Sequence, residues 1–192
     1  MSFEILLTIL MGIGLSAASG FRIFIPFLVI SIASLTGNLT LADSFNWIGT
    51  YPALITFSIA TIIEIAGYYI PWVDNILDTI ASPAAVIAGM ILMAAVVSGM
   101  SPLFKWSLAI IAGGGVAGII QMLTGVTRVT SSLTTGGLGN PVVSSVESGS
   151  SLTLSALAIF TPVIAGIVVT ALVFWAIKFL INRLAAKSKA PL

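Results

Sequence analysis

The strongest candidate for chemistry in this sequence is Arg22, the one charged residue in an apolar stretch that runs from Ile5 to Leu35. A guanidinium at that depth in a bilayer is costly, so it needs a carboxylate, a water-filled cavity or an anionic ligand. Ser19 and Gly20 precede the arginine and Pro26 follows it, so small residues and a helix breaker flank the charge. We therefore predict a binding site around Arg22, with Ser19 and Gly20 beside it.

Two kinds of partner for Arg22 are compatible with the sequence. A structural ion pair with Glu64, or with an acid of residues 71–82, would neutralise the charge. A bound anion or a lipid headgroup would also neutralise it and would give the arginine a role in binding. Arg128, at the end of a later apolar run, could assist Arg22, or it could extend its charge to the membrane surface.

Two glutamates are candidates for proton coupling. Glu64 lies six residues from the end of the apolar run 51–70, roughly a turn and a half below the interface. A carboxyl at that depth could bind and release protons, whereas one packed against Arg22 would stay ionised in a structural role. Glu147 is the second candidate, because it lies in a polar segment that could line the same site.

Asp74 and Asp78 have i, i+4 spacing, which places both carboxylates on one helix face. Such a pair can hold Mg²⁺ on a diphosphate, which would indicate an intramembrane enzyme. That chemistry needs a second acidic motif, which the sequence lacks. The alternative is that the two acids simply face water.

Residues 125–150 interrupt the apolar pattern with many Ser, Thr and Gly residues. Hydroxyls and flexible backbone can replace a hydration shell along a permeation path, although a flexible external loop is the alternative. Val142, Val143 and Val146 give the segment an apolar edge, which favours a packed position. The substrate-binding residues that we predict here are Thr134, Thr135, Gly136, Gly137 and Asn140.

The composition is that of a helical membrane protein. Of the 192 residues 58% are hydrophobic and 7% are charged, and the mean hydropathy is +1.19, whereas roughly a quarter of an ordinary soluble domain is charged. The sequence has no cysteine and no histidine, which excludes thiolate chemistry, imidazole bases and the usual zinc sites. We expect no cofactor and no nucleic-acid partner.

The apolar runs predict an all-α polytopic protein with about five to six transmembrane helices, some of them broken or re-entrant. A straight helix over 5–35 would be roughly 46 Å long, well beyond a hydrocarbon core of roughly 30 Å, so it must tilt or break near Ser19-Gly20. The remaining expected elements are spans at 51–70, 83–98, 103–123 and 152–184, and an interfacial or re-entrant helix at 71–82.

The whole chain, 1–192, reads as a single transmembrane domain, with a short basic tail at 185–192. Lysine and arginine gather near the C-terminus, so the positive-inside rule places that end in the cytoplasm. Short matches recur in the same order in residues 1–100 and 101–184, including Ser82-Pro83 with Thr161-Pro162. They indicate an inverted pseudo-repeat, and transporters often bind substrate between such repeats.

Small residues within the fourth span predict close helix packing. Gly113-Gly-Gly115 and Gly118 have no Lys-Ser/Thr after them, so they do not form a phosphate loop. A chain this small encloses little cavity, so we expect a homo-oligomer. The glycine face of this span is the candidate contact between copies.

Several motifs together resemble the bacterial domain of unknown function 4126 family. They are Gly14-Leu-Ser-Ala-Ala-Ser-Gly-Phe-Arg22, Tyr68-Tyr-Ile-Pro-Trp-Val-Asp-Asn75 with Asp78, Gly113-Gly-Gly115, and Thr134-Thr-Gly-Gly137 through Asn140-Pro141. The resemblance covers nearly the whole chain. It implies a compact multi-span protein of the bacterial inner membrane and brings no known activity with it.

Our functional prediction is therefore based on the residues themselves. We expect a small transporter or channel in the lipid bilayer with a polar central cavity for an anionic or zwitterionic solute or a lipid phosphate. The first alternative is a structural or assembly subunit whose buried charges fix helix packing. The second is an enzyme that acts on a lipid diphosphate through Asp74 and Asp78.

Overall fold

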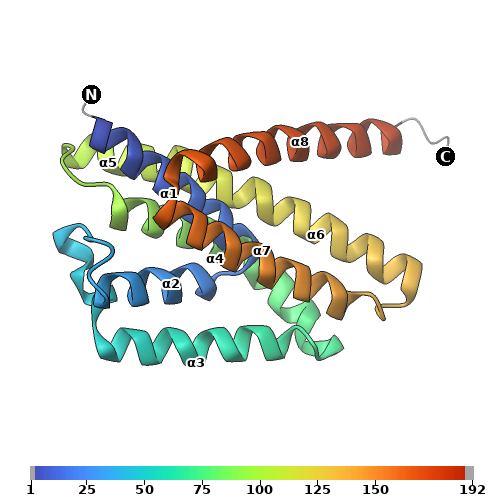
Figure 1. The fold of residues 1–192 in the computed structure, drawn as a ribbon. Coiled ribbons are helices and arrows are strands. Elements are labelled where there is room, and N and C mark those ends of the chain that lie inside the picture. Colours follow the sequence, from blue (N-terminus) through green and yellow to red (C-terminus); the bar gives the residue numbers. More distant parts are fainter. Residues whose placement is uncertain (1–2, 189–192) are drawn as a thin grey trace.

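The computed structural model describes residues 3–188, and within them the side chains other than those of residues 71, 72, 75 and 183–188. All regular elements of this described part are helical, as the composition predicts. Helices α1 (Phe3–Phe21), α4 (Pro71–Val96), α6 (Gly115–Thr135), α7 (Asn140–Phe160) and α8 (Pro162–Ser188) form a bundle, and α2 (Phe24–Leu35) and α3 (Tyr51–Gly67) cover one side of it (Figure 1).

Helix α1 is the centre of the bundle and packs against α4, α6, α7 and α8. Its small residues permit this. An added Cβ at Gly12 would meet Met93 Sδ at 2.1 Å, one at Gly14 would meet Ala158 Cβ at 2.7 Å, and one at Gly20 would meet the Ala117 carbonyl oxygen at 2.6 Å. The small residues before Arg22 therefore serve close helix packing, which is their usual function in membrane bundles.

The apolar stretch 5–35 is broken, as its length predicts. The break falls at Arg22-Ile23, where α1 ends, and α2 then runs back toward the end of the bundle at which α1 began (Figure 1). A 3-10 helix, η1 (Asp43–Gly49), and α3 follow, bent by 66° relative to each other. Thr50 caps α3 by accepting a hydrogen bond from the Ala53 N–H, and Pro52 occupies the first turn.

The prediction of a separate interfacial helix at 71–82 is wrong. Residues 71–82 are the first part of α4, which continues through Pro83 to Val96. Asp74 is only 3% exposed, because its carboxylate binds Arg128 within the protein. The charge of Asp74 is therefore compensated inside the protein, so this part of α4 does not need to lie at the membrane surface.

The fourth span is longer than predicted. Helix α5 (Pro102–Leu108), a π-helical segment η2 (Ala109–Gly114) and α6 continue one another over Pro102–Thr135. The glycines of η2 do serve close packing, but against α4 of the same chain: a Cβ at Gly113 would lie 2.7 Å from the Gly89 carbonyl oxygen. This part of the glycine face is therefore covered within one copy.

Residues 125–150 form a helical hairpin, so the expectation of an irregular segment or loop there is wrong. Helix α6 ends at Thr135, Gly136 and Gly137 turn with φ of 63° and 90°, and α7 begins at Asn140. The hydroxyls do not disrupt the helices, because they donate to the carbonyl four residues earlier, as Thr130 does to Val126. The two helices of this hairpin, α6 and α7, are called the α6–α7 hairpin below.

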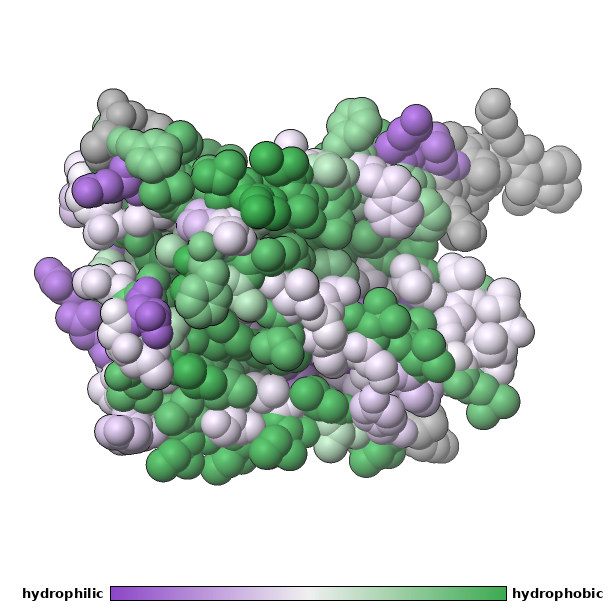
Figure 2. Space-filling model, in the orientation of Figure 1, coloured by the Kyte–Doolittle hydropathy of each residue, from purple (hydrophilic) through white to green (hydrophobic). Residues whose placement is uncertain are grey.

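The expected single span at 152–184 is also wrong. Thr161, at φ −142° and ψ 65°, is not helical and separates α7 from α8. Within the described part of the chain, five helices are long and apolar enough to cross a membrane, or six if the bent η1–α3 pair counts as one span. Hydrophobic side chains cover the middle of the face in Figure 2, and the most hydrophilic ones gather toward its two ends.

Candidate functional site

Arg22 lies in the interior, 1% exposed, between the end of α1 and the start of α2. Its Nη2 is 3.1 Å from Glu147 Oε2 on α7 and donates hydrogen bonds to Ser144, at 2.6 Å to Oγ and 3.2 Å to the carbonyl oxygen. Ser144 and Glu147 are three residues apart and share a helix face. One turn of α7 therefore holds one nitrogen, Nη2, of the guanidinium.

Arg128 on α6 binds the same glutamate from the other side. Its Nε donates to Glu147 Oε1 at 3.1 Å, its Nη2 binds Glu147 Oε2, and its Nη1 binds Asp74 Oδ1 on α4. Asp78, one turn further along α4, has Oδ1 3.6 Å from Arg128 Nε. Arg22, Arg128, Asp74, Asp78 and Glu147 are called the ion cluster below.

The ring of Tyr68 lies against both arginines. The Cζ atoms of Arg22 and Arg128 are 3.8 Å and 4.0 Å from its centroid. A desolvated guanidinium is attracted to an aromatic face, so the ring adds stabilisation that carboxylates alone do not provide. Tyr68 directly follows α3, and burial raises the pKa of its hydroxyl above the ordinary phenol value, so the group stays neutral.

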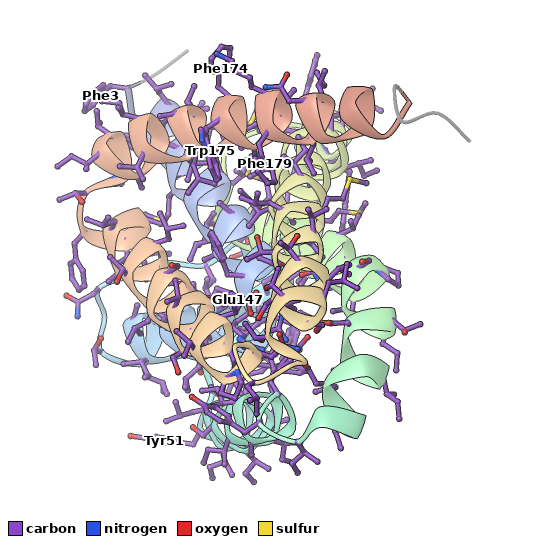
Figure 3. The ribbon with its side chains drawn as sticks, turned by 90° about the vertical axis from the view of Figure 1, so that its right-hand side faces the viewer. Phe3, Tyr51, Glu147, Phe174, Trp175 and Phe179 are labelled. Atoms are coloured by element: carbon purple, nitrogen blue, oxygen red, sulfur yellow. The ribbon has the colours of Figure 1, made fainter. Side chains whose placement is uncertain are left out.

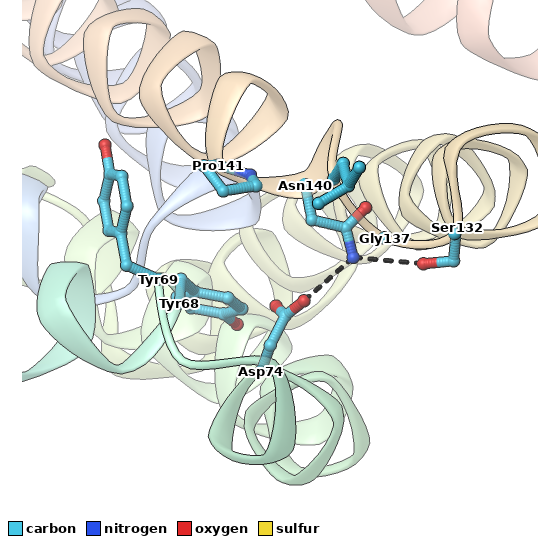
Figure 4. Close-up of a pocket in the computed structure, with 9 residues that line it drawn as sticks. Tyr68, Tyr69, Asp74, Ser132, Gly137, Asn140 and Pro141 are labelled. Atoms are coloured by element: carbon cyan, nitrogen blue, oxygen red, sulfur yellow. Dashed lines mark hydrogen bonds between the residues drawn. The ribbon is translucent and has the colours of Figure 1, made fainter.

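A polar pocket of about 440 Å³ reaches the ion cluster from the end of the bundle at which the α6–α7 hairpin turns (Figures 1 and 4). In it, Asn140 Nδ2 donates to Asp74 Oδ2 and to Ser132 Oγ, each at 3.0 Å (Figure 4). The residues around the pocket are Tyr68, Tyr69, Asp74, Ser132, Gly136, Gly137, Leu138, Asn140 and Pro141.

Glu64 does not form an ion pair with Arg22. Its two carboxylate oxygens accept hydrogen bonds from the backbone N–H groups of Ile23 and Phe24, at 2.8 Å and 3.0 Å. These are the first amides of α2, which the break at Arg22 leaves without helical partners. Glu64 therefore caps a helix that begins inside the protein, and a negative charge is favoured there by the helix dipole.

Several buried polar atoms of the site have no hydrogen-bond partner within the described part of the chain. On the donor side they are Nε and Nη1 of Arg22, and on the acceptor side they are Oδ1 of Asp78 and Oδ1 of Asn140. Leaving such groups unpaired in the interior is costly, so a ligand or a water molecule could pair with them. The site thus has donors at Arg22 and acceptors at Asp78 and Asn140 that make no hydrogen bond within the described residues, although Oδ1 of Asp78 lies 3.6 Å from Arg128 Nε.

The charges of the ion cluster do not balance. Within the residues that the structure describes, the carboxylates of Asp74, Asp78 and Glu147 lie within ion-pair distance of the guanidiniums of Arg22 and Arg128. With all five ionised the cluster carries one net negative charge. A proton or a cationic group of a ligand would neutralise it.

The structure brings most of the predicted site residues together. Arg22, Arg128, Glu147, Asp74 and Asp78 form the ion cluster, and Asn140, Gly136 and Gly137 line the pocket next to it. The remaining four predicted binding residues serve the helices instead. Ser19, Thr134 and Thr135 donate within their own helices, to Ser16, Thr130 and Ser131, and Gly20 of α1 packs against Ala117 and Ile120 of α6.

Three residues of the site, Tyr68, Tyr69 and Ser144, were missed by the sequence reasoning, which expected the backbone and hydroxyls of 131–140, Ser132 included, to line the site. Tyr68 and Tyr69 read as interfacial aromatics, and Ser144 is one of many hydroxyl residues between 125 and 150. If the segment is taken as helical, the i, i+3 spacing of Ser144 and Glu147 puts both residues on one helix face, which could have identified Ser144. Of the two predicted metal-binding residues, Asp74 has both carboxylate oxygens engaged, one by Arg128 and one by Asn140. This arrangement favours a role in ion pairing over metal binding.

Comparison with known proteins places the chain in a family. A family model described as a domain of unknown function, number 4126, matches residues 9–182, and the chain belongs to this family. No curated protein and no solved structure matched the chain. The function must therefore be argued from the site itself.

Proposed function

We propose that this member of the domain of unknown function 4126 family is a small transporter or channel of the bacterial inner membrane, for an anionic or zwitterionic solute or a lipid phosphate. The supporting observation is Arg22, which is 1% exposed and whose Nε and Nη1 have no hydrogen-bond acceptor among the described residues. Buried donors are normally paired, so two unpaired donors on one buried arginine favour a role in binding. The anionic part of the substrate would bind these donors.

The polar pocket would be the access route from one membrane face. It ends at Asp74 and Tyr68, and the ring of Tyr68 lies against Arg22. Movement of this ring would connect the pocket to Arg22, so Tyr68 is suited to gate the site. The basic residues near the C-terminus support a cytoplasmic position for this face, by the positive-inside rule.

Proton coupling would involve the acids of the site. Of the two glutamates singled out by the sequence, Glu64 is engaged by two backbone amides and Glu147 by two arginines. A proton on either carboxyl would release a helix end or an arginine, which is a way to couple proton binding to movement. Association of several copies in the membrane would complete the transporter.

The test uses protein reconstituted in liposomes, with fluxes of small anions and zwitterions measured with and without a pH gradient. Arg22→Lys keeps the charge but loses the planar guanidinium, whose three nitrogens donate hydrogen bonds in different directions. We expect this variant to lose at least nine-tenths of the flux while it assembles normally in size-exclusion chromatography. Lys178→Gln removes an exposed cation of α8 and is the matched control, which should keep its flux.

Two alternatives predict different results. If the buried charges only fix helix packing, Arg22→Lys lowers the unfolding temperature and no flux is found for the wild type either. This reading is favoured by Arg128, whose Nε, Nη1 and Nη2 all bind carboxylates. If Asp74 and Asp78 act on a lipid diphosphate through Mg²⁺, the double Asn variant loses turnover and EDTA inactivates the wild type.

A further inference from the structure

The α6–α7 hairpin has a second hollow, an apolar crevice of about 320 Å³. The polar pocket lies where the hairpin faces α3 and α4, whereas the crevice lies where it faces α1 and α8. In Figure 3, Trp175 extends from α8 toward this space, and Glu147 lies deeper between α6 and α7. The residues around the crevice are Phe21, Leu123, Thr124, Thr127, Val142, Val143, Val146, Glu147 and Trp175.

The ion cluster connects the two hollows. Glu147 borders the crevice, Asp74 lines the polar pocket, and Arg128 binds both of these acids. Phe21, at the rim of the crevice, directly precedes Arg22. A molecule that is apolar at one end and charged at the other could therefore place its apolar end in the crevice and its charged end at the cluster.

The crevice opens beside exposed apolar side chains. Val142, Val146 and Trp175 around it are 67%, 63% and 55% exposed, on helices that are long and apolar enough to cross a membrane. In a bilayer such side chains would contact acyl chains. A water-soluble solute would gain nothing from this crevice, whereas an acyl chain would fill it.

The free polar atoms define the headgroup. Nε and Nη1 of Arg22 are donors, and a hydrogen bond from a guanidinium to a phosphate oxygen is strengthened by the charges of both groups. Oδ1 of Asp78 and Oδ1 of Asn140 are acceptors, and Asn140 is nine-tenths buried beside the pocket. These acceptors are suited to an ammonium group. A phosphate alone would add to the negative charge of the cluster, and an amine alone would leave Arg22 without an acceptor, whereas a zwitterion supplies a partner to both and leaves the net charge unchanged.

We propose that the crevice and the ion cluster together bind one phospholipid whose headgroup carries both a phosphate and an ammonium group. Its phosphate binds Arg22, its ammonium binds Asp78 and Asn140, and an acyl chain lies in the crevice between α6 and α7. This inference rests on the proposed function and names its substrate class. The Arg128–Glu147 pair, which joins α6 to α7, would open to let the headgroup pass.

The test measures binding to the purified protein in maltoside micelles, from the shift of its unfolding temperature. The probes are a short-chain phosphatidylethanolamine, a phosphatidic acid with the same chains, an alkylamine, and phosphoethanolamine without chains. We expect the phosphatidylethanolamine to bind at least tenfold more tightly than each of the others, because only it has all three groups.

Variants separate the two ends of the ligand. Val146→Trp fills the crevice from an exposed position and should weaken phosphatidylethanolamine binding about tenfold, whereas Val129→Trp, at a 60% exposed valine outside the crevice, should not. Asp78→Asn removes the surplus negative charge and should abolish the preference for phosphatidylethanolamine over phosphatidic acid. All three positions are at least partly exposed, so folding should be retained in each variant.

Two results would overturn the inference and they have different meanings. If phosphoethanolamine without chains binds as tightly as the lipid, or if Val146→Trp changes nothing, the lipid assignment fails and the transporter proposal stands for a soluble zwitterion. If none of the probes binds and the liposomes show no flux, both proposals fail together.

Discussion

Arg22 and Arg128 share one carboxylate, Glu147, and one aromatic ring, Tyr68. Two guanidiniums this close would repel each other unless a negative charge and a polarisable face lay between them. Burying each charge also has a desolvation cost, which is offset only by good geometry and several hydrogen bonds. At the scale of single residues the site is therefore held together by a small number of mutually dependent contacts.

The ring of Tyr68, rather than its hydroxyl, is expected to stabilise the two arginines. Tyr68→Phe keeps the aromatic face, so most of the stability should remain. Tyr68→Leu removes the face, and because each desolvated cation–π contact contributes about 2 kcal/mol, unfolding should become easier by roughly 2–4 kcal/mol. Chemical denaturation in detergent would measure the difference, and an equal loss in both variants would contradict the role of the ring.

At the scale of elements, the unusual features are helix ends and close crossings inside the bundle. Helix α2 begins in the interior at the Arg22 break, and Glu64 of α3 supplies the acceptors that its first amides lack. Helix α4 crosses η2 where Gly89 meets Gly113. Both features depend on a single residue type at a single position, so each can be tested by a small substitution.

Glu64 is expected to hold the start of α2. Glu64→Gln keeps the size of the side chain but leaves one oxygen where the carboxylate has two, so one of the two amides loses its acceptor. We expect faster hydrogen exchange of the Ile23 and Phe24 amides and a loss of about 1 kcal/mol, typical of a helix cap. Glu4→Gln, an exposed acid of α1, is the control and should leave exchange at residues 23–24 unchanged.

Gly113 and Gly115 form a matched pair for the crossing of η2 with α4. Gly113→Ala would place its Cβ 2.7 Å from a Gly89 carbonyl oxygen and 2.8 Å from Met93 Cβ, so it should destabilise the protein by about 1–3 kcal/mol. Gly115→Ala meets no described atom within 4 Å and should be neutral or stabilising by about 0.5–1 kcal/mol. Unfolding temperatures that ranked the two the other way would refute this account of the crossing.

At the scale of the whole molecule, the start of α1 and the end of α8 lie at opposite ends of the bundle (Figure 1). The polar pocket opens at the C-terminal end, and the α2–η1 connection lies at the N-terminal end. The clustered bases near the C-terminus favour a cytoplasmic position for that end. The pocket would then open to the cytoplasm and the N-terminus would face the periplasm.

Single cysteines can test this orientation, since the chain has none of its own. Asn38 and Leu138 are both exposed and lie at the two ends of the bundle. A membrane-impermeant maleimide should label Asn38→Cys in intact cells and Leu138→Cys only after lysis. The reverse pattern would place the C-terminus outside and overturn the cytoplasmic assignment of the pocket.

The sequence by itself determined the helical membrane class, the break in the stretch 5–35 and the interior position of Arg22. These follow from composition and from the length of apolar runs against the thickness of a bilayer, which are local properties. The pseudo-repeat of residues 1–100 and 101–184 stays a prediction. Its matched segments differ locally, since Pro83 lies within α4 and Pro162 begins α8.

Only the tertiary structure decided which acid meets which arginine. Glu64 was as plausible a partner for Arg22 as any acid of 71–82, yet Glu147 binds it and Glu64 caps α2. The packing of side chains far apart in the sequence decides which faces of α1, α6 and α7 meet. The hydrophobic periodicity of each helix does not predict this packing. The same packing allows α4 to begin at Pro71. Its first turns can be buried because Arg128 neutralises Asp74, which would otherwise have to face water.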